Sequence, residues 1–397
     1  MKTIKRYYFL TAFILLFISQ NNCVAASKLS DRSEISLLTC VQGDELYSIF
    51  GHSAIRVKDP IQRIDYVYNY GTFNFAEPNF YVKFVKGKLN YRLAKSTFLS
   101  FIQEYIDENR TVTEQILDLK IEEKQQIFDF LETNYLPENR YYLYDFFFDN
   151  CATRIRDVFQ TVFKNKLIFD DSVSEKNLNF RDLIGLYLVN KPWSHLGLNT
   201  LLGQPTDRRA NPPEYMFLPD FLKDAFGNAS IVREGELIFL VGKERIVYEA
   251  KEKESKRHFQ ITPTLSFLVI LLLGILLSYL EYRIKKHYRF VDAVLFTVSG
   301  FMGIFLLLLW FATDHKPAAM NWNIWWAIPM HFIFGILLFR KKMSKITSSY
   351  FLIAGIITFL LIPFWYFIPQ EIDFRLFPFV ILLGLRSLMI YSKKFRV

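Results

Sequence analysis

Two residues in this sequence have the types needed for nucleophilic acyl-transfer chemistry, a cysteine and a histidine. Cys151 follows Asp149 and Asn150 and opens a segment with helical character. Asn150 or Asp149 is a good N-cap, because a short side-chain oxygen accepts amide protons of the first helical turn. The N–H groups at a helix start favour negative charge and shift a thiol toward the nucleophilic thiolate. The sequence therefore predicts Cys151 as the nucleophile.

The best candidate base is His52, in the segment FGHSAIRV at residues 50–57. The pattern predicts a strand from His52, a turn at residues 59–60 and a return strand at residues 65–70. A hairpin centred on residues 59–62 places Asn69 opposite His52, where it would orient the imidazole. Asp65 is the alternative, since a register slip changes the choice. His195 is the weaker candidate for the base.

Cys151 has two alternative interpretations. A free cysteine is commonly a small buried core residue. Cys40 is the other cysteine beyond residue 26, and a bridge between the two would exclude the nucleophile. No cofactor is predicted, and no metal site, because no His, Cys or acidic pairs have ligand-like spacing.

Arginines near the predicted site are candidates for binding a lipid phosphate. Arg56 follows His52, and Arg154 follows Cys151. Such side chains are ordinarily solvated or salt-bridged, but a guanidinium matches a phosphate bidentately. Tyr70 and Asn150, each next to a predicted catalytic residue, complete the predicted substrate-binding residues of this region.

The apolar residues are concentrated at the two ends of the chain, which is 51% hydrophobic overall. Residues 1–26 combine an early basic segment, an apolar core at residues 7–18 and a small-residue cleavage site, which is typical of a signal peptide. Five apolar spans follow near the C-terminus, each close to the ~20 residues that cross a bilayer. They are residues 263–282, 290–313, 322–339, 350–369 and 374–391.

The basic residues predict the orientation of these spans. Lys and Arg cluster after the first, third and fifth spans. The positive-inside rule then places those segments and the C-terminus in the cytoplasm and residues 27–262 outside. The formal net charge of +9 is mostly this topology signal, so no nucleic-acid partner is predicted. The loop containing His315 emerges beside the thiol domain. His315 is either a polar residue at the membrane interface or a further substrate-binding residue.

We expect an exported α+β domain at residues 27–250, a linker at 251–262 and a five-helix transmembrane domain at 263–397. Strands are expected near residues 37–41, 52–58, 65–70 and 111–119, and helices near 97–108 and 122–134. Residues 237–241 and 245–250 are expected to form a final hairpin.

Several motifs in this chain resemble the Lnb family of lipoprotein N-acyltransferases from Bacteroides-like bacteria. They are LLTC at 37–40, GDELYS at 43–48, FGHSAIRV at 50–57, YNYG at 68–71 and DNCATR at 149–154, with residues 313–315 and 321–323. The order of histidine before an Asn-Cys pair also resembles permuted papain-like thiol enzymes, including lecithin:retinol acyltransferase. That resemblance implies an antiparallel sheet packed against the cysteine-bearing helix.

The Lnb resemblance implies a reaction and its partners. Cys151 would take a fatty acyl chain from a membrane phospholipid with His52 as the base, and would pass it to the N-terminal amine of a diacylated lipoprotein. It implies an inner-membrane location with a periplasmic catalytic domain. The alternatives are a thiol peptidase or amidase acting on cell-envelope peptides, and a non-catalytic envelope assembly protein. The patterns do not specify an oligomeric state.

Overall fold

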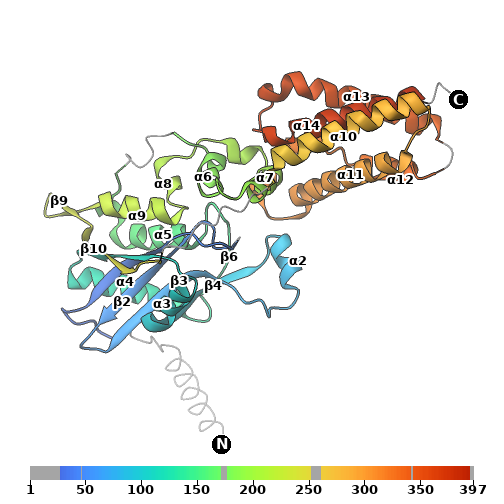
Figure 1. Cartoon of the computed structure of the whole chain (residues 1–397). Helices are drawn as coiled ribbons and strands as arrows, with labels where there is room; N and C mark the ends of the chain where they lie inside the picture. Colours follow the sequence, from blue (N-terminus) through green and yellow to red (C-terminus); the bar gives the residue numbers. More distant parts are fainter. Residues whose placement is uncertain (1–26, 46, 171–176, 252–260, 341–342, 394–397) are drawn as a thin grey trace, which may run out of the picture.

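The computed structural model describes residues 27–45, 47–170, 177–251, 261–340 and 343–393. The predicted signal peptide at 1–26 and most of the predicted linker lie outside the described residues. The described chain forms an α+β part followed by a bundle of long helices (Figure 1).

The α+β part is built on an antiparallel sheet of seven strands in the order β10-β5-β1-β2-β3-β4-β6. This architecture confirms the predicted α+β class. The strands are β1 (Glu34–Cys40), β2 (His52–Asp59), β3 (Ile64–Thr72), β4 (Asn90–Thr97), β5 (Val112–Leu117), β6 (Tyr141–Leu143) and β10 (Val241–Tyr248).

Helices cover both faces of this sheet, so its central strands are apolar on both sides. In β1, Ile35 and Leu37 pack into a core with helices α4 (Ile121–Tyr135), α5 (Cys151–Phe163) and α9 (Pro219–Asn228). Leu38 and Cys40 alternate with them and face α3 (Phe98–Asp107) on the opposite side. The cysteine-bearing helix α5 therefore packs against the sheet, as expected.

The predicted final hairpin is wrong. Its first half is β9 (Glu236–Phe239), which pairs with β8 (Ser230–Arg233) in a small second sheet with β7 (Leu167–Ile168). Its second half is β10, which pairs with β5 at the edge of the main sheet. The buried Leu240 between them bonds to both Ala229 and Asp118, so the chain changes sheets where the sequence suggested a turn.

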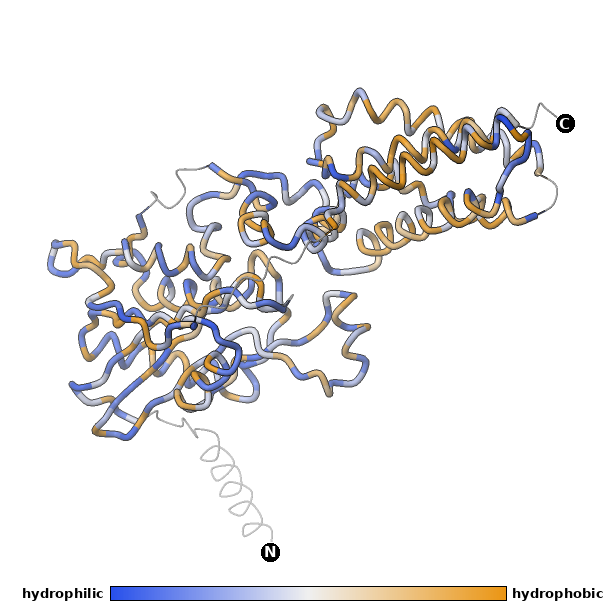
Figure 2. Tube along the Cα trace, viewed as in Figure 1, coloured by the Kyte–Doolittle hydropathy of each residue, from blue (hydrophilic) through white to orange (hydrophobic). Residues whose placement is uncertain are grey.

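Among the residues that the structure describes, four helices are long and apolar enough to span a membrane. They include α10 (Pro263–Ile284), α11 (Arg289–Ala312), α13 (Lys345–Phe364) and α14 (Phe377–Lys393), and Figure 2 shows hydrophobic residues along all four. The chain is thus a membrane protein. The predicted third span, residues 322–339, is a 3-10 turn η5 (Trp322–Trp325) and a short helix α12 (His331–Leu337).

This third segment lies along α11 in a broken form. A Cβ added at Gly303 would meet the carbonyl oxygen of Ala327 at 1.7 Å, and one at Gly300 would meet the amide nitrogen of Phe332 at 1.9 Å. Pro329, which has no amide N–H, lies between η5 and α12. Hydropathy alone therefore identified the segment without showing that its helix is interrupted.

Four further elements follow α5 in the α+β part: α6 (Phe180–Tyr187), α7 (Pro192–Leu201), η3 (Gln204–Asp207) and α8 (Pro212–Tyr215). Of these, α7 and η3 contact the bundle. Carbonyl groups at the end of α7 accept hydrogen bonds from buried amides of the bundle loops: Asn321 bonds to Thr200 at 2.9 Å, and Gln370 bonds to Leu202 at 3.0 Å. The carbonyl groups at the end of α7, which lack partners within the helix, thus hold the α+β part against the bundle.

Candidate active site

Cys151 is the first residue of α5, as the sequence predicted. The Asn150 side chain caps this helix: its Oδ1 accepts the amide protons of Ala152 and Thr153, both at 2.9 Å. The Thr153 hydroxyl accepts the Asn150 amide in return, at 2.8 Å. This reciprocal cap fixes the backbone that carries the thiol.

His52 opens β2 and hydrogen-bonds to the Cys151 side chain. Burial alone raises the pKa of the Cys151 thiol, but the charge and hydrogen bond of His52 and the amides of Ser53 and Ala152 outweigh it, so the pKa is lowered. Burial lowers the pKa of His52, but the Cys151 charge and the bonds to Cys151 and Asn69 raise it overall. The two shifts together favour a thiolate–imidazolium pair.

Asn69 orients the imidazole. Its Oδ1 lies 2.6 Å from His52 Nε2, which leaves Nδ1 as the ring nitrogen that faces the sulfur. The antiparallel register of β2 and β3 pairs Ile55 with Tyr68. Continued by one residue, this register places Asn69 opposite Ala54 and not opposite His52. The predicted register was thus off by two residues, but such a shift keeps the same face of the sheet, and the diagonal contact forms. Asp65, the alternative, pairs with Arg56 instead.

Gly71 and Tyr144 form part of the surroundings of the thiol, and neither was among the predicted site residues. Gly71 has a φ of 85°, and a Cβ there would lie 3.6 Å from Cys151 Cβ, 3.6 Å from Tyr144 and 4.0 Å from the Cys151 amide nitrogen. Only glycine adopts this backbone conformation readily. The Asn150 cap engages the amides of Ala152 and Thr153, and the cap does not use the Cys151 amide at the start of the helix.

Tyr142 and Arg154 also lie near the cysteine. The Arg154 guanidinium lies 4.0 Å from the Tyr142 ring centroid and pairs with Asp149. Tyr70 packs edge-on against Tyr142 and is buried in the core. Arg154 is partly exposed, so it remains a candidate for binding a lipid phosphate. Tyr70 is buried and supports the site by packing against Tyr142.

The structure gives two other predicted substrate-binding residues structural roles. Arg56 is buried, pairs with Asp65 at 2.7 Å and with Glu114 at 3.1 Å, and lies 3.4 Å from the Phe98 ring centroid. Its charge is neutralised on the α3 face, so it has no group left to bind lipid phosphate. Asn150 is 3% exposed and uses its amide nitrogen to hold the Phe146 and Phe217 carbonyls.

The two remaining histidines of the prediction lie away from the thiol. His315 contacts the α+β part through a 3.0 Å bond from Nε2 to the carbonyl of Phe84, in helix α2 (Phe80–Val85). His195 lies on α7 beside Gly185, where burial and Arg375 lower its pKa. Neither is placed to act on Cys151 as a base.

The second cysteine is a free thiol. Cys40 is buried, hydrogen-bonds to Tyr105, and has a pKa raised by burial. It is the register partner of His52 on the neighbouring strand. Both cysteines of the described chain are therefore unbridged, and the described residues hold no group of three or more His, Cys, Asp or Glu side chains suited to a metal.

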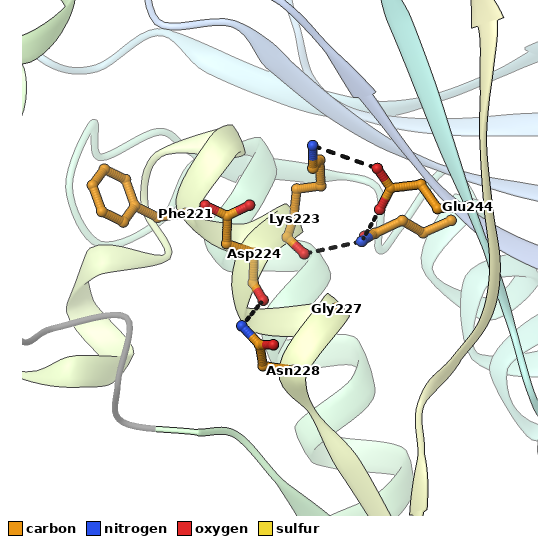
Figure 3. Close-up of a pocket in the computed structure, with 7 residues that line it drawn as sticks. Phe221, Lys223, Asp224, Gly227, Asn228 and Glu244 are labelled. Carbon is orange, nitrogen blue, oxygen red and sulfur yellow. Dashed lines mark hydrogen bonds and ion pairs between the residues drawn. The ribbon is translucent and has the colours of Figure 1, made fainter.

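A polar pocket of about 380 Å³ lies elsewhere, between α9 and the sheet edge. Figure 3 shows its lining: Glu244 pairs with Lys223 and accepts a 2.9 Å bond from Gln115, and Asn228 bonds to the Asp224 carbonyl. The lining contains no cysteine, serine or histidine, and the buried Oε1 of Gln115 has no hydrogen-bond partner among the described residues. This pocket is separate from the Cys151–His52 pair.

The fold and the site define an α+β domain with a thiol–imidazole pair, followed by helices long and apolar enough to span a membrane. Two family models match the chain in order: the Lnb N-terminal periplasmic domain at residues 20–181, and the Lnb transmembrane domain at residues 253–396. The matched stretches together cover well over half of the chain, which belongs to the Lnb family. Comparison with curated proteins and with solved structures gives no match.

Proposed function

We propose that this protein is a lipoprotein N-acyltransferase. It moves a fatty acyl chain from a membrane phospholipid, through a thioester on Cys151, to the N-terminal amine of a diacylglyceryl-cysteine lipoprotein. The observation that carries the proposal is the hydrogen-bonded series Cys151–His52–Asn69 in an Lnb periplasmic domain attached to membrane helices.

In the first step, the Cys151 thiolate attacks an ester carbonyl of the phospholipid. A carbon–sulfur bond forms, the ester carbon–oxygen bond breaks, and the His52 imidazolium gives its proton to the leaving lysophospholipid oxygen. The Cys151 amide holds the developing oxyanion. Asn69 keeps the ring oriented, because its side-chain oxygen accepts the Nε2–H of His52.

In the second step, the α-amine of the lipoprotein cysteine attacks the thioester. The carbon–nitrogen bond forms, the carbon–sulfur bond breaks, and the amine proton passes to the Cys151–His52 pair, which returns to its starting state. A thioester is opened readily by an amine, and exclusion of water beside the membrane limits hydrolysis. The site requires no metal or cofactor for either step.

The same assignment gives the location. We infer an inner-membrane protein whose Cys151 domain is periplasmic and whose C-terminus is cytoplasmic, since basic residues such as Arg283, Lys286 and Arg340 gather at the opposite ends of the spans. The broken segment at residues 322–339 counts as a crossing in this topology. Its first end docks on α7, and its far end approaches Arg289, whose guanidinium bonds to the Arg340 carbonyl at 3.4 Å.

The deciding experiment is intact-mass analysis of the full-length protein purified in detergent with phospholipid. We expect a fatty-acyl adduct that maps to Cys151, is released by hydroxylamine, and transfers to an added diacylated lipopeptide with a free amine. Cys151→Ala should abolish the adduct. Lack of any adduct in the presence of donor, or an adduct released only to water, would contradict the transferase. Altered cell-wall peptides with normally N-acylated lipoproteins in cells lacking the protein would support a peptidase instead.

A further inference from the structure

A second functional surface lies between β3 and β4, in a segment that we name the aromatic arm, residues 73–88. It contains the short helix α2 and extends from the sheet toward the outer end of α11 (Figure 1). Five of its large apolar side chains are exposed: Phe75, Tyr81, Val82, Phe84 and Val85. An apolar surface this dense is unusual on a soluble domain and marks a site of interaction.

The arm is fixed to the loop that leaves the membrane bundle. The Asp314 amide donates to the Lys86 carbonyl at 2.9 Å, and His315 Nε2 contacts the Phe84 carbonyl at 3.0 Å. Asp314 lies two residues after the end of α11. The exposed side chains of α2 are therefore held at the level where a spanning helix leaves the bilayer.

The neighbouring residues have the composition of a membrane interface. At the outer end of α11, Trp310 and Phe311 stack at 4.6 Å between ring centroids, and Phe311 is largely exposed. Aromatic rings are enriched at this depth of a bilayer, and basic side chains there meet lipid phosphates. Lys86 and Lys88, both exposed, follow directly after the apolar residues of α2.

A continuous row of rings joins the arm to the thiol site. Phe80 contacts Phe73 at 5.7 Å between centroids, Phe73 contacts Tyr91 at 5.3 Å, and Tyr91 stacks on Tyr144 at 4.3 Å. Tyr144 borders Gly71, as Cys151 does. This apolar connection suits an acyl chain better than a polar peptide.

We propose that the aromatic arm inserts into the bilayer leaflet nearest the exported domain and holds phospholipid beside Cys151. The apolar face of such an element lies about 5–10 Å into the boundary between headgroups and acyl chains. Insertion into the bilayer is inferred from the arm alone and does not depend on the reaction at Cys151. Its use in delivering an acyl donor rests on the acyltransferase function proposed above.

The test measures the depth of one side chain in a membrane. Full-length protein carrying Cys151→Ala and Tyr81→Cys is labelled at position 81 with a polarity-sensitive fluorophore and placed in nanodiscs of phosphatidylethanolamine and phosphatidylglycerol. The matched control is Leu99→Cys on α3, since Tyr81 is 76% and Leu99 77% exposed. Buried Cys40 should not react in the folded protein.

We expect the emission of the label at position 81 to be blue-shifted. Its fluorescence intensity should fall about twofold when the lipids carry a shallow spin label, and neither effect should occur at position 99. Equal emission and quenching at the two positions would overturn the inference. So would a blue shift at position 81 that needs an added diacylated lipopeptide, because the arm would then bind the acceptor. Since these variants lack Cys151, the result is independent of whether acyl transfer occurs.

Discussion

Cys40 and Cys151 are both buried thiols of one domain, and His52 lies close to each, yet their pKa values move in opposite directions. Burial raises the pKa of Cys40, whose contacts are Tyr105 and the α3 core. Burial also raises that of Cys151, but the His52 charge and hydrogen bond and two backbone amides reverse the effect. The environment of Cys40 is that of a core residue, whereas the environment of Cys151 favours the thiolate that the proposed acyl transfer needs.

The difference comes from the elements that present each sulfur. Cys40 is the last residue of a central strand, and its side chain points into the apolar layer below α3. Cys151 begins a helix whose Asn150 cap holds its first turn, at the end of the sheet where His52 and Asn69 meet. Burial without a charged partner suppresses ionisation, whereas the same burial beside an imidazole strengthens the ion pair.

His52→Ala should have the largest effect on this contrast, because it removes both the base and the charge that stabilises the thiolate. We expect acyl-adduct formation to fall about 10²- to 10⁴-fold. The pKa of Cys151 should then rise toward that of Cys40. The measurement is the initial rate of adduct formation. The control is His195→Ala, which removes an imidazole from α7 instead of from the site. Equal losses in the two variants would mean that His52 is not the base.

The pH dependence follows from the two opposite shifts at the site. The pKa of Cys151 is lowered and that of His52 is raised, and both directions favour the ion pair. The first acylation step should rise as Cys151 ionises and fall as His52 loses its proton. Alkylation of Cys151 should already be rapid at a pH where an ordinary thiol is protonated. Alkylation that begins only near the ordinary thiol pKa would contradict the pair.

Asn69→Ala should cost less, because it removes the group that orients the imidazole and leaves the base in place. We expect a loss of about 10- to 100-fold in acylation rate and a fall in the pKa of His52, since the Asn69 bond raises it. The high-pH limb of the profile would move to lower pH. Asn69→Gln, which keeps the amide, should behave more like the parent if it reaches Nε2. A rate loss with an unchanged pH profile would assign Asn69 a merely structural role.

Two parts of this site could be predicted because their geometry is local, whereas the contact between Cys151 and His52 joins segments far apart in the sequence. The cap of Cys151 is set by Asn150 next to it, and the His52–Asn69 contact is set by one hairpin, in which an error of two residues preserves the face. The burial of Arg56 in ion pairs could not be predicted, because one of its partners, Glu114, comes from β5, a strand distant in sequence. No local pattern shows which strand will lie beside β1.

The other differences have the same origin. The switch of the chain at Leu240 between two sheets depends on bonds to Ala229 and Asp118, which only the assembled domain brings together. The backbone of the interrupted third span lies directly against Gly300 and Gly303 of α11. Hydropathy sums the residues of a segment and is insensitive to such contacts. The arm was overlooked because its exposed aromatic residues are significant only beside a membrane.

Cys40→Ala should have the smallest effect and complete the comparison. It removes a sulfur that packs under α3, so we expect a loss of about 1 kcal/mol in the free energy of unfolding, as for the removal of a small buried group. Acyl-adduct formation should stay within about twofold of the parent, because Cys40 neither bonds to the substrate-facing thiol nor holds His52.

Cys151→Ala should do the reverse, with no adduct and little change in stability. The measurements are thermal unfolding in detergent and intact mass on the same samples. A strong loss of adduct in folded Cys40→Ala would mean that the two thiols act together.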